Sequence, residues 1–277
     1  EKTLKRTQKW GGSLMQSTYQ QLFLVLPQTT QDAQRYQLLQ ANVGPVLGNL
    51  KFDAAIHEKQ QALGHEWRSS FQLPVLMLAS SREGEEALFL QALLHHPLQN
   101  QLLSNFQILI VPRHPQRFNE VAQLIEQTGL SLSRRSQWPD SNPVPATIVL
   151  GDSIGEMPIY YSASACVLMG GSFLPLGGQN LIEACLYGCP VIMGPSMFNF
   201  AQASLAAISA GSGQTVPNLS EGLTLAHTWL QSQQLSNLQA LATGFSQQHA
   251  GASLASAQLL KTIYLESFNK RAASIAK

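Results

Sequence analysis

Short apolar segments alternate with helical patterns along most of this chain, and this alternation most constrains its fold. The apolar segments have the length of strands and few polar interruptions, which is typical of strands buried on both faces of a parallel sheet. The expected strands are Leu22–Leu26, Val75–Ala79, Gln107–Val111, Thr147–Leu150, Cys166–Met169, Val191–Met193 and Gln214–Val216. The expected helices are Gln31–Leu39, Ala54–Leu63, Gly84–His95, Arg117–Thr128, Pro158–Ala163, Asn180–Tyr187, Phe200–Ala210 and Glu221–Leu230. The pattern predicts an α/β fold, a Rossmann-like doubly wound parallel sheet with its site at the carboxyl ends of the strands.

Three segments are expected along the chain. Residues 49–234 hold most of the alternating pattern and form the main domain. Residues 1–48 offer one strand and one helix, too little for an independent core, and are interpreted as a remnant of a preceding domain and linker. Residues 235–277 are expected to form two helices, broken near Gly251, that pack back on the sheet or on another domain. Because the chain begins at Glu1 in a basic segment, we expect a piece of a longer protein.

Composition excludes several classes of partner. The 277 residues contain 17 basic and 16 acidic side chains, so no strong field attracts nucleic acid and no nucleic-acid partner is expected. The longest apolar runs fall well short of the ~20 residues that a membrane helix needs, so the chain is expected to be soluble. Cys166, Cys185 and Cys189 lack the companions of a zinc set, and we expect buried thiols in a reducing compartment and no metal.

Two glycine pairs flank one short loop. An apolar strand leads into Gly170-Gly171-Ser172, and Gly177-Gly178 precedes a helix that begins near Asn180. Glycines let the backbone approach a ligand closely, and a helix start offers N–H groups to an anion. Glu183, one turn after Asn180, adds a carboxylate suited to the two hydroxyls of a ribose. We interpret the loop as a nucleotide-sugar site, with two ordinary tight turns as the alternative.

Four further loops carry polar side chains next to predicted strands or at the start of the main domain. Pro112-Arg113-His114-Pro115 offers a planar guanidinium to phosphate or carboxylate, or is a solvated loop. Ser80–Glu86 is either one wall of the site or an ordinary helix start. Gly151–Pro158 either reads a nucleobase through its backbone, with Glu156 nearby, or caps the next helix. Lys51 in Asn49–Asp53 either neutralises charge in a transition state or is a surface lysine.

Taken in order, these motifs resemble those of the 3-deoxy-D-manno-octulosonic acid (Kdo) transferases. That family shows Asn-Leu-Lys-Phe-Asp, Ser-Thr-His-x-Gly-Glu-Glu, Pro-Arg-His-Pro, Gly-Asp-Thr-Met-Gly-Glu and Gly-Gly-His-Asn-x-x-Glu. A following Gly-Pro-x-x-x-Asn-Phe motif is matched by Gly194–Phe200. The match is collinear from about Leu22 to Val216 and is therefore more specific than any single motif.

The resemblance implies the C-terminal half of a GT-B glycosyltransferase that holds the donor CMP-Kdo without a metal or other cofactor. The implied donor-binding residues are Pro112, Arg113, His114, Ile154, Gly155, Glu156, Met157, Gly171, Ser172, Gly178, Asn180, Leu181, Ile182 and Glu183, with Ser81, Arg82, Glu85 and Gln179 as possible contacts of Kdo itself. Lys51 would match a lysine that stabilises the transition state.

The resemblance also implies what the rest of the enzyme contributes. In that family the N-terminal domain carries the catalytic base, the surface for the lipid A precursor and the membrane contact, at the cytoplasmic face of the inner membrane of Gram-negative bacteria. We therefore expect this chain alone to be inactive in the transfer that begins the lipopolysaccharide core.

Four positions depart from the family pattern. Gln179, Arg82 and Ser196 stand where histidine is usual, and Leu176 stands where arginine is common. These changes affect the expected recognition of Kdo more than that of CMP. Two alternatives stay open: a GT-B transferase or epimerase that uses a UDP-sugar, and a non-catalytic module that binds nucleotide-sugars.

Overall fold

The computed structural model describes residues 12–139 and 142–275. The chain divides into two compact units, one formed by residues 1–54 and 248–277 and the other by residues 55–247. The segment boundaries predicted from the sequence lie after residues 48 and 234 instead. The functional division of the chain into three segments stays a prediction.

The larger unit is built on a sheet of seven parallel strands in the order β3-β4-β2-β1-β5-β6-β7. The strands are β1 (Val75–Ser81), β2 (Gln107–Pro112), β3 (Leu132–Arg134), β4 (Ile148–Leu150), β5 (Ser164–Met169), β6 (Val191–Met193) and β7 (Gly213–Thr215). The predicted doubly wound α/β fold is confirmed.

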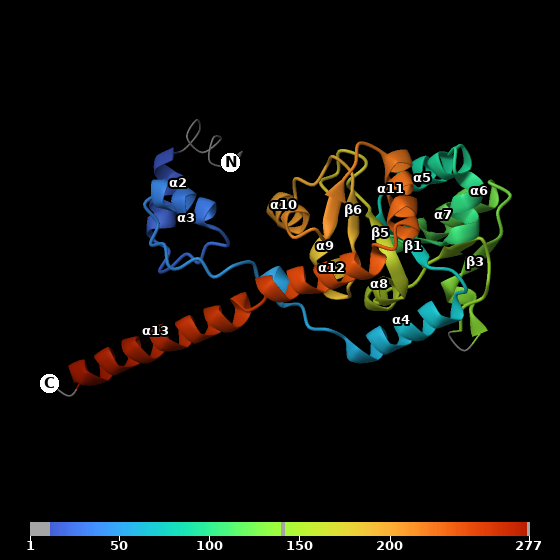
Figure 1. Cartoon of the computed structure of the whole chain (residues 1–277). Coiled ribbons are helices and arrows are strands. Elements are labelled where there is room, and N and C mark those ends of the chain that lie inside the picture. The colour runs from blue at the N-terminus through green and yellow to red at the C-terminus, as the bar shows by residue number, and fades with distance from the viewer. Residues whose placement is uncertain (1–11, 140–141, 276–277) are drawn as a thin grey trace. The chain divides into compact units, whose positions relative to one another are not determined.

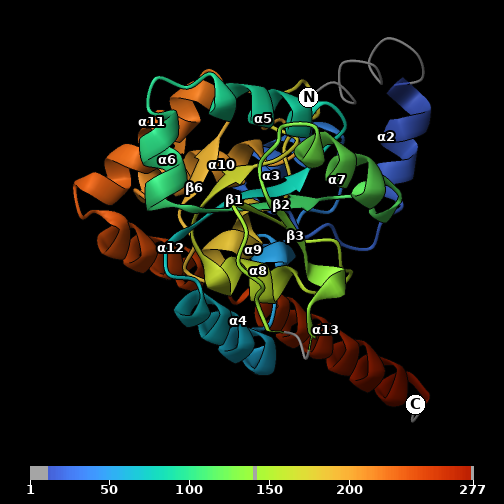
Figure 2. The same cartoon turned by 90° about the vertical axis from the view of Figure 1, so that its right-hand side faces the viewer.

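Helices cover both faces of this sheet (Figures 1 and 2). On one face, apolar residues of α5, α6, α7 and α11 pack against Leu76, Ile108, Leu168 and their neighbours in a continuous core. On the other face, α4 packs along α8, which contacts β5, and α9 contacts β6. The α-helices of this unit are α4 (Glu58–Ser70), α5 (Glu85–Leu94), α6 (Gln99–Asn105), α7 (Phe118–Glu126), α8 (Met157–Ala163), α9 (Leu181–Leu186), α10 (Ala201–Ser209), α11 (Leu219–Gln231) and most of α12 (Leu235–His249), and short 3-10 turns lie at η2 (Pro115–Arg117) and η3 (Arg135–Gln137).

The smaller unit contains α2 (Gly12–Gln20), α3 (Thr30–Leu38), the 3-10 turn η1 (Leu50–Asp53) and α13 (Ala252–Ile275). The predicted strand Leu22–Leu26 is wrong. Only Val25 forms an isolated bridge, to Val43, and Phe23 is 72% exposed, because no neighbouring strand extends the pairing. The predicted pair of C-terminal helices is confirmed, with Gly251 between them at φ 110°.

Some expectations for the helices and strands differ in detail, and the expectation for the cysteines is confirmed. The helix predicted at Ala54–Leu63 begins later, at Glu58, and continues to Ser70, where Trp67 is buried. Helix α6 and the edge strand β3 were not predicted, because each is short and mostly polar. The three cysteines are free and buried, as predicted, and burial raises the pKa of the Cys166 and Cys185 thiols to about 12.

Candidate functional site

The order of the strands places a switch point between β1 and β5. From β1 the chain moves to β2 on one side, and from β5 it moves to β6 on the other, so the loops that follow β1 and β5 diverge. Ligands of open α/β sheets bind in the crevice that such divergence leaves beyond the carboxyl ends of the strands. The predicted site segments after β1, β2, β4 and β5 all lie at this edge.

The two sides of the switch point approach each other closely at Gly170. Its N–H donates to the carbonyl of Ala79 at 2.8 Å, and a β-carbon at Gly170 would lie only 2.5 Å from the carbonyl oxygen of Ser80. Ser80 itself has φ 53°, an uncommon backbone conformation for a residue other than glycine. Close packing of backbone on backbone therefore holds the ends of β1 and β5 together.

The glycine loop after β5 is closed by its own hydrogen bonds. The N–H of Gly178 donates to the carbonyl of Gly171 at 2.7 Å, and both glycines have positive φ. Ser172 is buried, and its Oγ accepts from the N–H of Gly194 at 2.7 Å. Ser196 Oγ accepts from the N–H of Gly177 at 3.0 Å. The glycines therefore serve turns, and the N–H groups of Gly171, Gly177 and Gly178 are bonded within the protein.

Helix α9 follows this loop. The Oδ1 of Asn180 accepts from the N–H of Ile182 at 3.2 Å and so caps the helix. Leu181 and Ile182 are buried as whole residues, and the N–H of Ile182 is already bonded to Asn180. The Gln179 amide nitrogen lies near Gly171, 3.1 Å from where a β-carbon there would stand.

Glu183 is the half-buried carboxylate of this edge. Burial raises its pKa, and the nearby charges of His57 and Arg113 offset part of that effect. Among the described residues, neither Glu183 nor Arg113 forms a hydrogen bond or ion pair through its side chain. Arg113 is exposed, and its backbone N–H donates to the carbonyl of Ser81 at 2.9 Å. The guanidinium of Arg113, in the loop after β2, thus acts through its charge on the carboxyl group of Glu183 in α9.

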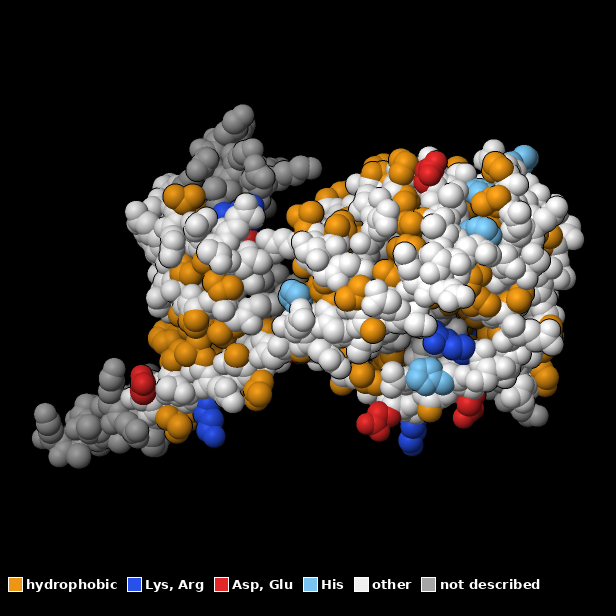
Figure 3. Space-filling model, in the orientation of Figure 1, with side chains coloured by type: hydrophobic (Ala, Val, Ile, Leu, Met, Phe, Trp, Pro, Cys, Tyr) orange, Lys and Arg blue, Asp and Glu red, His pale blue; other side chains and the backbone are white. Residues whose placement is uncertain are grey.

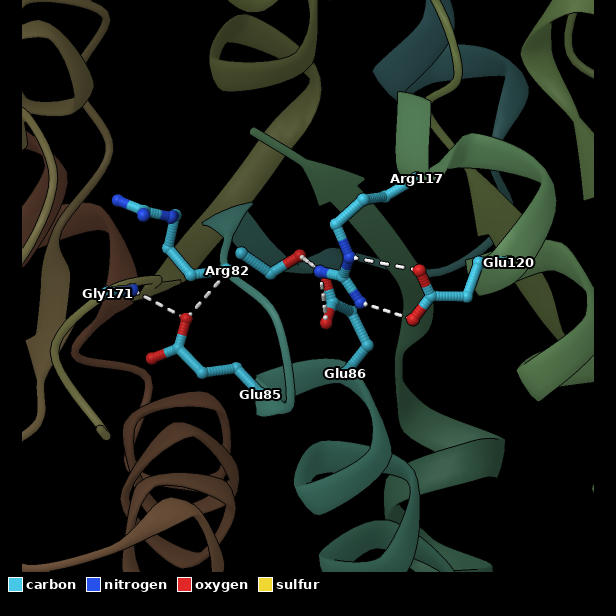
Figure 4. Close-up of polar contacts among 7 residues, drawn as sticks. Arg82, Glu85, Glu86, Arg117, Glu120 and Gly171 are labelled. Carbon is cyan, nitrogen blue, oxygen red and sulfur yellow. Dashed lines mark hydrogen bonds and ion pairs between the residues drawn. The ribbon is translucent and has the colours of Figure 1, made fainter. Parts of the chain in front are cut away.

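Two carboxylates at the start of α5 are fully buried (Figure 4). Glu86 forms an ion pair with Arg117, whose Nη1 lies 2.7 Å and 2.9 Å from its two oxygens, and it accepts from Ser81 Oγ at 2.7 Å. Arg117 also reaches the exposed Glu120, at 2.9 Å. Glu85 accepts backbone N–H groups only. The sequence predicted neither Arg117 as a partner nor a role for Glu86, although an acidic pair in a first helical turn was a visible signal.

The loop after β4 is held by arginines from the β3 region. Arg134 Nε lies 2.7 Å from the buried carboxylate of Asp152, and Arg135 Nη2 lies 2.8 Å from that of Glu156. The guanidinium of Arg135 also stacks on Trp67 and Trp138, 5.0 Å and 5.6 Å from the ring centroids. These contacts leave the tip of the loop in solvent, where Ile154 is 77% exposed. The arginine partners of Asp152 and Glu156 could not be predicted from the sequence, because β3 was not predicted.

The other predicted residues have these places. Pro112 is buried and His114 is half-buried beside Arg113. Gly155 is exposed, its carbonyl accepts from Gln60 at 2.9 Å, and the Met157 sulfur lies 4.0 Å from Ser80 Oγ. Lys51 is exposed on η1, in the other unit of the chain, so its role beside the switch point stays a prediction.

Residues 12–139 and 142–275 offer neither a cluster of metal ligands nor a helix able to span a membrane. No cluster of three or more His, Cys, Asp or Glu side chains suited to a metal ion occurs there. No helix in these ranges combines the length and hydropathy that crossing a membrane requires. On the face drawn in Figure 3, charged side chains are few and scattered, as the 12% charged composition implies.

No protein-family model matches the chain. Two relatives are 3-deoxy-D-manno-octulosonic acid transferases, one from Bordetella pertussis that is 43% identical over 209 residues and one from Haemophilus influenzae that is 32% identical over 196 residues. The matches cover 76% and 68% of this chain but 49% and 44% of the relatives. The chain therefore spans about half the length of these relatives.

Solved structures point the same way. The C-terminal CMP-Kdo binding domain of WaaA from Acinetobacter baumannii is 29% identical, with a TM-score of 0.57 over 68% of this chain and 96% of that domain. HepE from Anabaena, in complex with UDP-glucose, shares the fold at 14% identity, with a TM-score of 0.53 over 87% of this chain and 63% of that one. The seven-stranded parallel sheet and its switch point are those of the C-terminal domain of a GT-B glycosyltransferase. Within that class, the chain belongs to the 3-deoxy-D-manno-octulosonic acid transferase family.

Proposed function

We propose that this chain is the donor-binding domain of a Kdo transferase and binds CMP-Kdo in the crevice between β1 and β5. Membership of the family and similarity to a domain described as CMP-Kdo binding support the proposal. In the whole enzyme, a hydroxyl of the lipid A precursor lipid IVA would attack C2 of Kdo. The bond from C2 to the phosphate oxygen would break, and CMP would leave.

One observation carries the proposal: at the carboxyl edge of the sheet the charge of Arg113 acts on the carboxyl group of Glu183, and neither side chain has a hydrogen-bonding partner among the described residues. A guanidinium binds phosphate through paired N–H donors, and a carboxylate accepts hydrogen bonds from vicinal hydroxyls. CMP presents a phosphate and a ribose diol joined by one short link, so a single ligand would satisfy both side chains.

The remaining donor contacts are proposed around this pair. The exposed tip of the loop after β4, Ile154–Met157, would meet the cytosine, mainly through its backbone. Arg82 and Gln179 would face the Kdo moiety on the side of Gly171, and Lys51 would stabilise the charge that develops on the departing phosphate. With basic side chains and backbone N–H groups for both anionic groups, transfer would need no metal.

The rest of the reaction is assigned to an N-terminal domain that lies outside this chain. That domain would supply the base that takes the proton of the acceptor hydroxyl, the lipid surface and the contact with the cytoplasmic face of the inner membrane. This chain would then hold the donor but transfer nothing alone. An assay of Kdo transfer to lipid IVA tests this point directly, and transfer by the chain alone would refute it.

The donor proposal is tested by calorimetric titration with CMP, using UDP as the comparison. We expect selective binding of CMP, weakened roughly 10- to 100-fold by Arg113→Ala or Glu183→Gln, since each removes a charge-assisted contact. Lys59→Ala and Glu126→Gln change the same kinds of charge at exposed positions and should leave the affinity unchanged. Equal or tighter binding of UDP would instead favour a UDP-sugar enzyme.

A further inference from the structure

Glu85 sits at the switch point and is buried completely, yet no basic side chain is hydrogen-bonded to it in the described parts of the chain. Its carboxylate accepts three backbone N–H groups instead. Oε2 accepts from Gly171 at 2.6 Å and from Arg82 at 2.9 Å, and Oε1 accepts from Phe173 at 3.1 Å. A buried carboxylate requires such donors because its desolvation is costly.

These three bonds join both sides of the crevice. Arg82 belongs to the loop after β1, and Gly171 and Phe173 belong to the glycine loop after β5. Figure 4 shows the Arg82 guanidinium pointing away from the ion pair of Glu86 and Arg117, on the side of Gly171, while its backbone turns toward Glu85. Glu85 therefore holds the backbone of Arg82 and leaves the guanidinium of Arg82 available to a ligand.

We propose that Glu85 is a positioning residue for the donor site, which sets the glycine loop and Arg82 in their binding geometry by holding their backbone. The proposal rests on the proposed function and revises one expectation of the sequence, in which Glu85 was a possible contact of Kdo. A side chain that is 0% exposed and bonded at both oxygens acts on the donor through Arg82 and Gly171.

The chemistry of the position favours a carboxylate over an amide. Three N–H donors converge on it, and a carboxylate is an acceptor at both ends. A glutamine could keep the bonds to Gly171 and Arg82, but its own NH2 group would face the N–H of Phe173. Glu85 also lies in the first turn of α5, a helix of ten residues, where the helix dipole stabilises negative charge. The carboxylate thus stays beside an anionic ligand with its charge already compensated.

Glu86, its neighbour in the chain, has a different task. Its charge is matched by Arg117, and it bonds the side chain of Ser81, whereas Glu85 bonds backbone across the switch point. Loss of Glu86 would leave Arg117 without its buried counter-charge and would reduce stability directly. A substitution of Glu85 can therefore change the geometry of the loops without breaking the buried ion pair of Glu86 and Arg117.

The first test needs no ligand. Amide hydrogen exchange of the unmodified chain should show Gly171 and Phe173 protected to nearly the level of the buried strand β1. In Glu85→Gln, we expect the amide of Phe173 to exchange at least tenfold faster while β1 and β2 keep their protection, because only the bond to Oε1 is lost. Free exchange of Gly171 in the unmodified chain would overturn the proposal even if the variant failed to fold.

The second test measures binding of CMP by the folded variants. Glu85→Gln should weaken CMP binding roughly tenfold at a temperature well below its unfolding transition, whereas the exposed control Glu126→Gln should not. A purely structural role would lower the melting temperature and leave the affinity unchanged, and that result would refute positioning. If the unmodified chain binds no CMP, the proposed function fails, while hydrogen exchange still decides whether Glu85 holds the loop.

Discussion

Alanine at Gly170 is the substitution that best tests how the switch point is built. The φ angle of Gly170 lies outside the region that only glycine favours, so its backbone would accept alanine. The added β-carbon, however, would lie 2.5 Å from the carbonyl oxygen of Ser80 and 2.6 Å from that of Ala79. Both are backbone atoms, which cannot rotate away as a side chain would.

The expected cost follows from these distances. Relief of the clash must move β5 from β1 and stretch the 2.8 Å bond between the N–H of Gly170 and the carbonyl of Ala79. Overpacking of this kind costs about 1–3 kcal/mol, and replacing glycine recovers about 0.4–1 kcal/mol through the unfolded chain. We therefore expect Gly170→Ala to lower the free energy of unfolding by about 1–2 kcal/mol.

Gly244→Ala is the matched control. Gly244 lies inside α12, and its β-carbon would meet nothing within 4 Å, so alanine should stabilise the protein by about 1 kcal/mol through helix propensity. Urea unfolding of the two variants beside the unmodified chain measures both effects. If Gly170→Ala proved as stable as the unmodified chain, the close approach of β1 and β5 would not be a constraint, and the reasoning would be wrong.

Three further substitutions test the charges of the chain. Burial raises the pKa of Glu183 above the value of the unfolded chain, so ionised Glu183 is unfavourable in the fold. Glu183→Gln should therefore unfold at higher urea than the unmodified chain at pH 7. A difference in stability between the two that persists below pH 4.5 would contradict this. Burial acts to raise the pKa of Asp53, but hydrogen bonds from the backbone of Gly251 and Ser253 outweigh this effect and lower the pKa. The stability that Asp53 contributes should be present at neutral pH and lost as pH falls through the lowered pKa. Asp53→Asn should therefore make the start of α13 more sensitive to proteolysis at pH 7 only. Arg117→Met should cost about 3–5 kcal/mol in urea unfolding because Glu86 loses its buried partner, whereas Glu120→Gln, at a side chain 55% exposed, should cost less than about 1 kcal/mol.

The sequence predicted the sheet well because its strands carry their signal locally. Val75–Ala79 and Cys166–Met169 are apolar throughout, and each is followed by a loop whose sequence is visibly polar or rich in glycine. Since parallel strands end at one edge, the loops with Arg113 and Glu183 were expected at that edge, and the charge of Arg113 offsets part of the rise in the pKa of Glu183. Leu22–Leu26 has the same apolar composition but no strand beside it, and a strand needs a partner that composition cannot reveal.

The role of α5 could not be predicted for a different reason. Acidic residues in a first helical turn fit any ordinary helix start, and two of the three partners of Glu85 are 86 and 88 residues away in the sequence. Only the crossover that brings β5 beside β1 shows that its carboxylate faces backbone N–H groups. The same holds for Glu156, whose partner Arg135 follows an edge strand of three residues that leaves little pattern.

Binding of CMP at the switch point between β1 and β5 can be located by NMR titration of the amide-labelled chain with CMP. We expect the largest shift changes on Arg113, Gly171 and Glu183 and on the tip Ile154–Gly155. Shift changes gathered instead on the outer face of α5 and α11, around the cavity of about 350 Å³ that Leu88, Phe173 and Leu219 help to line, would contradict it.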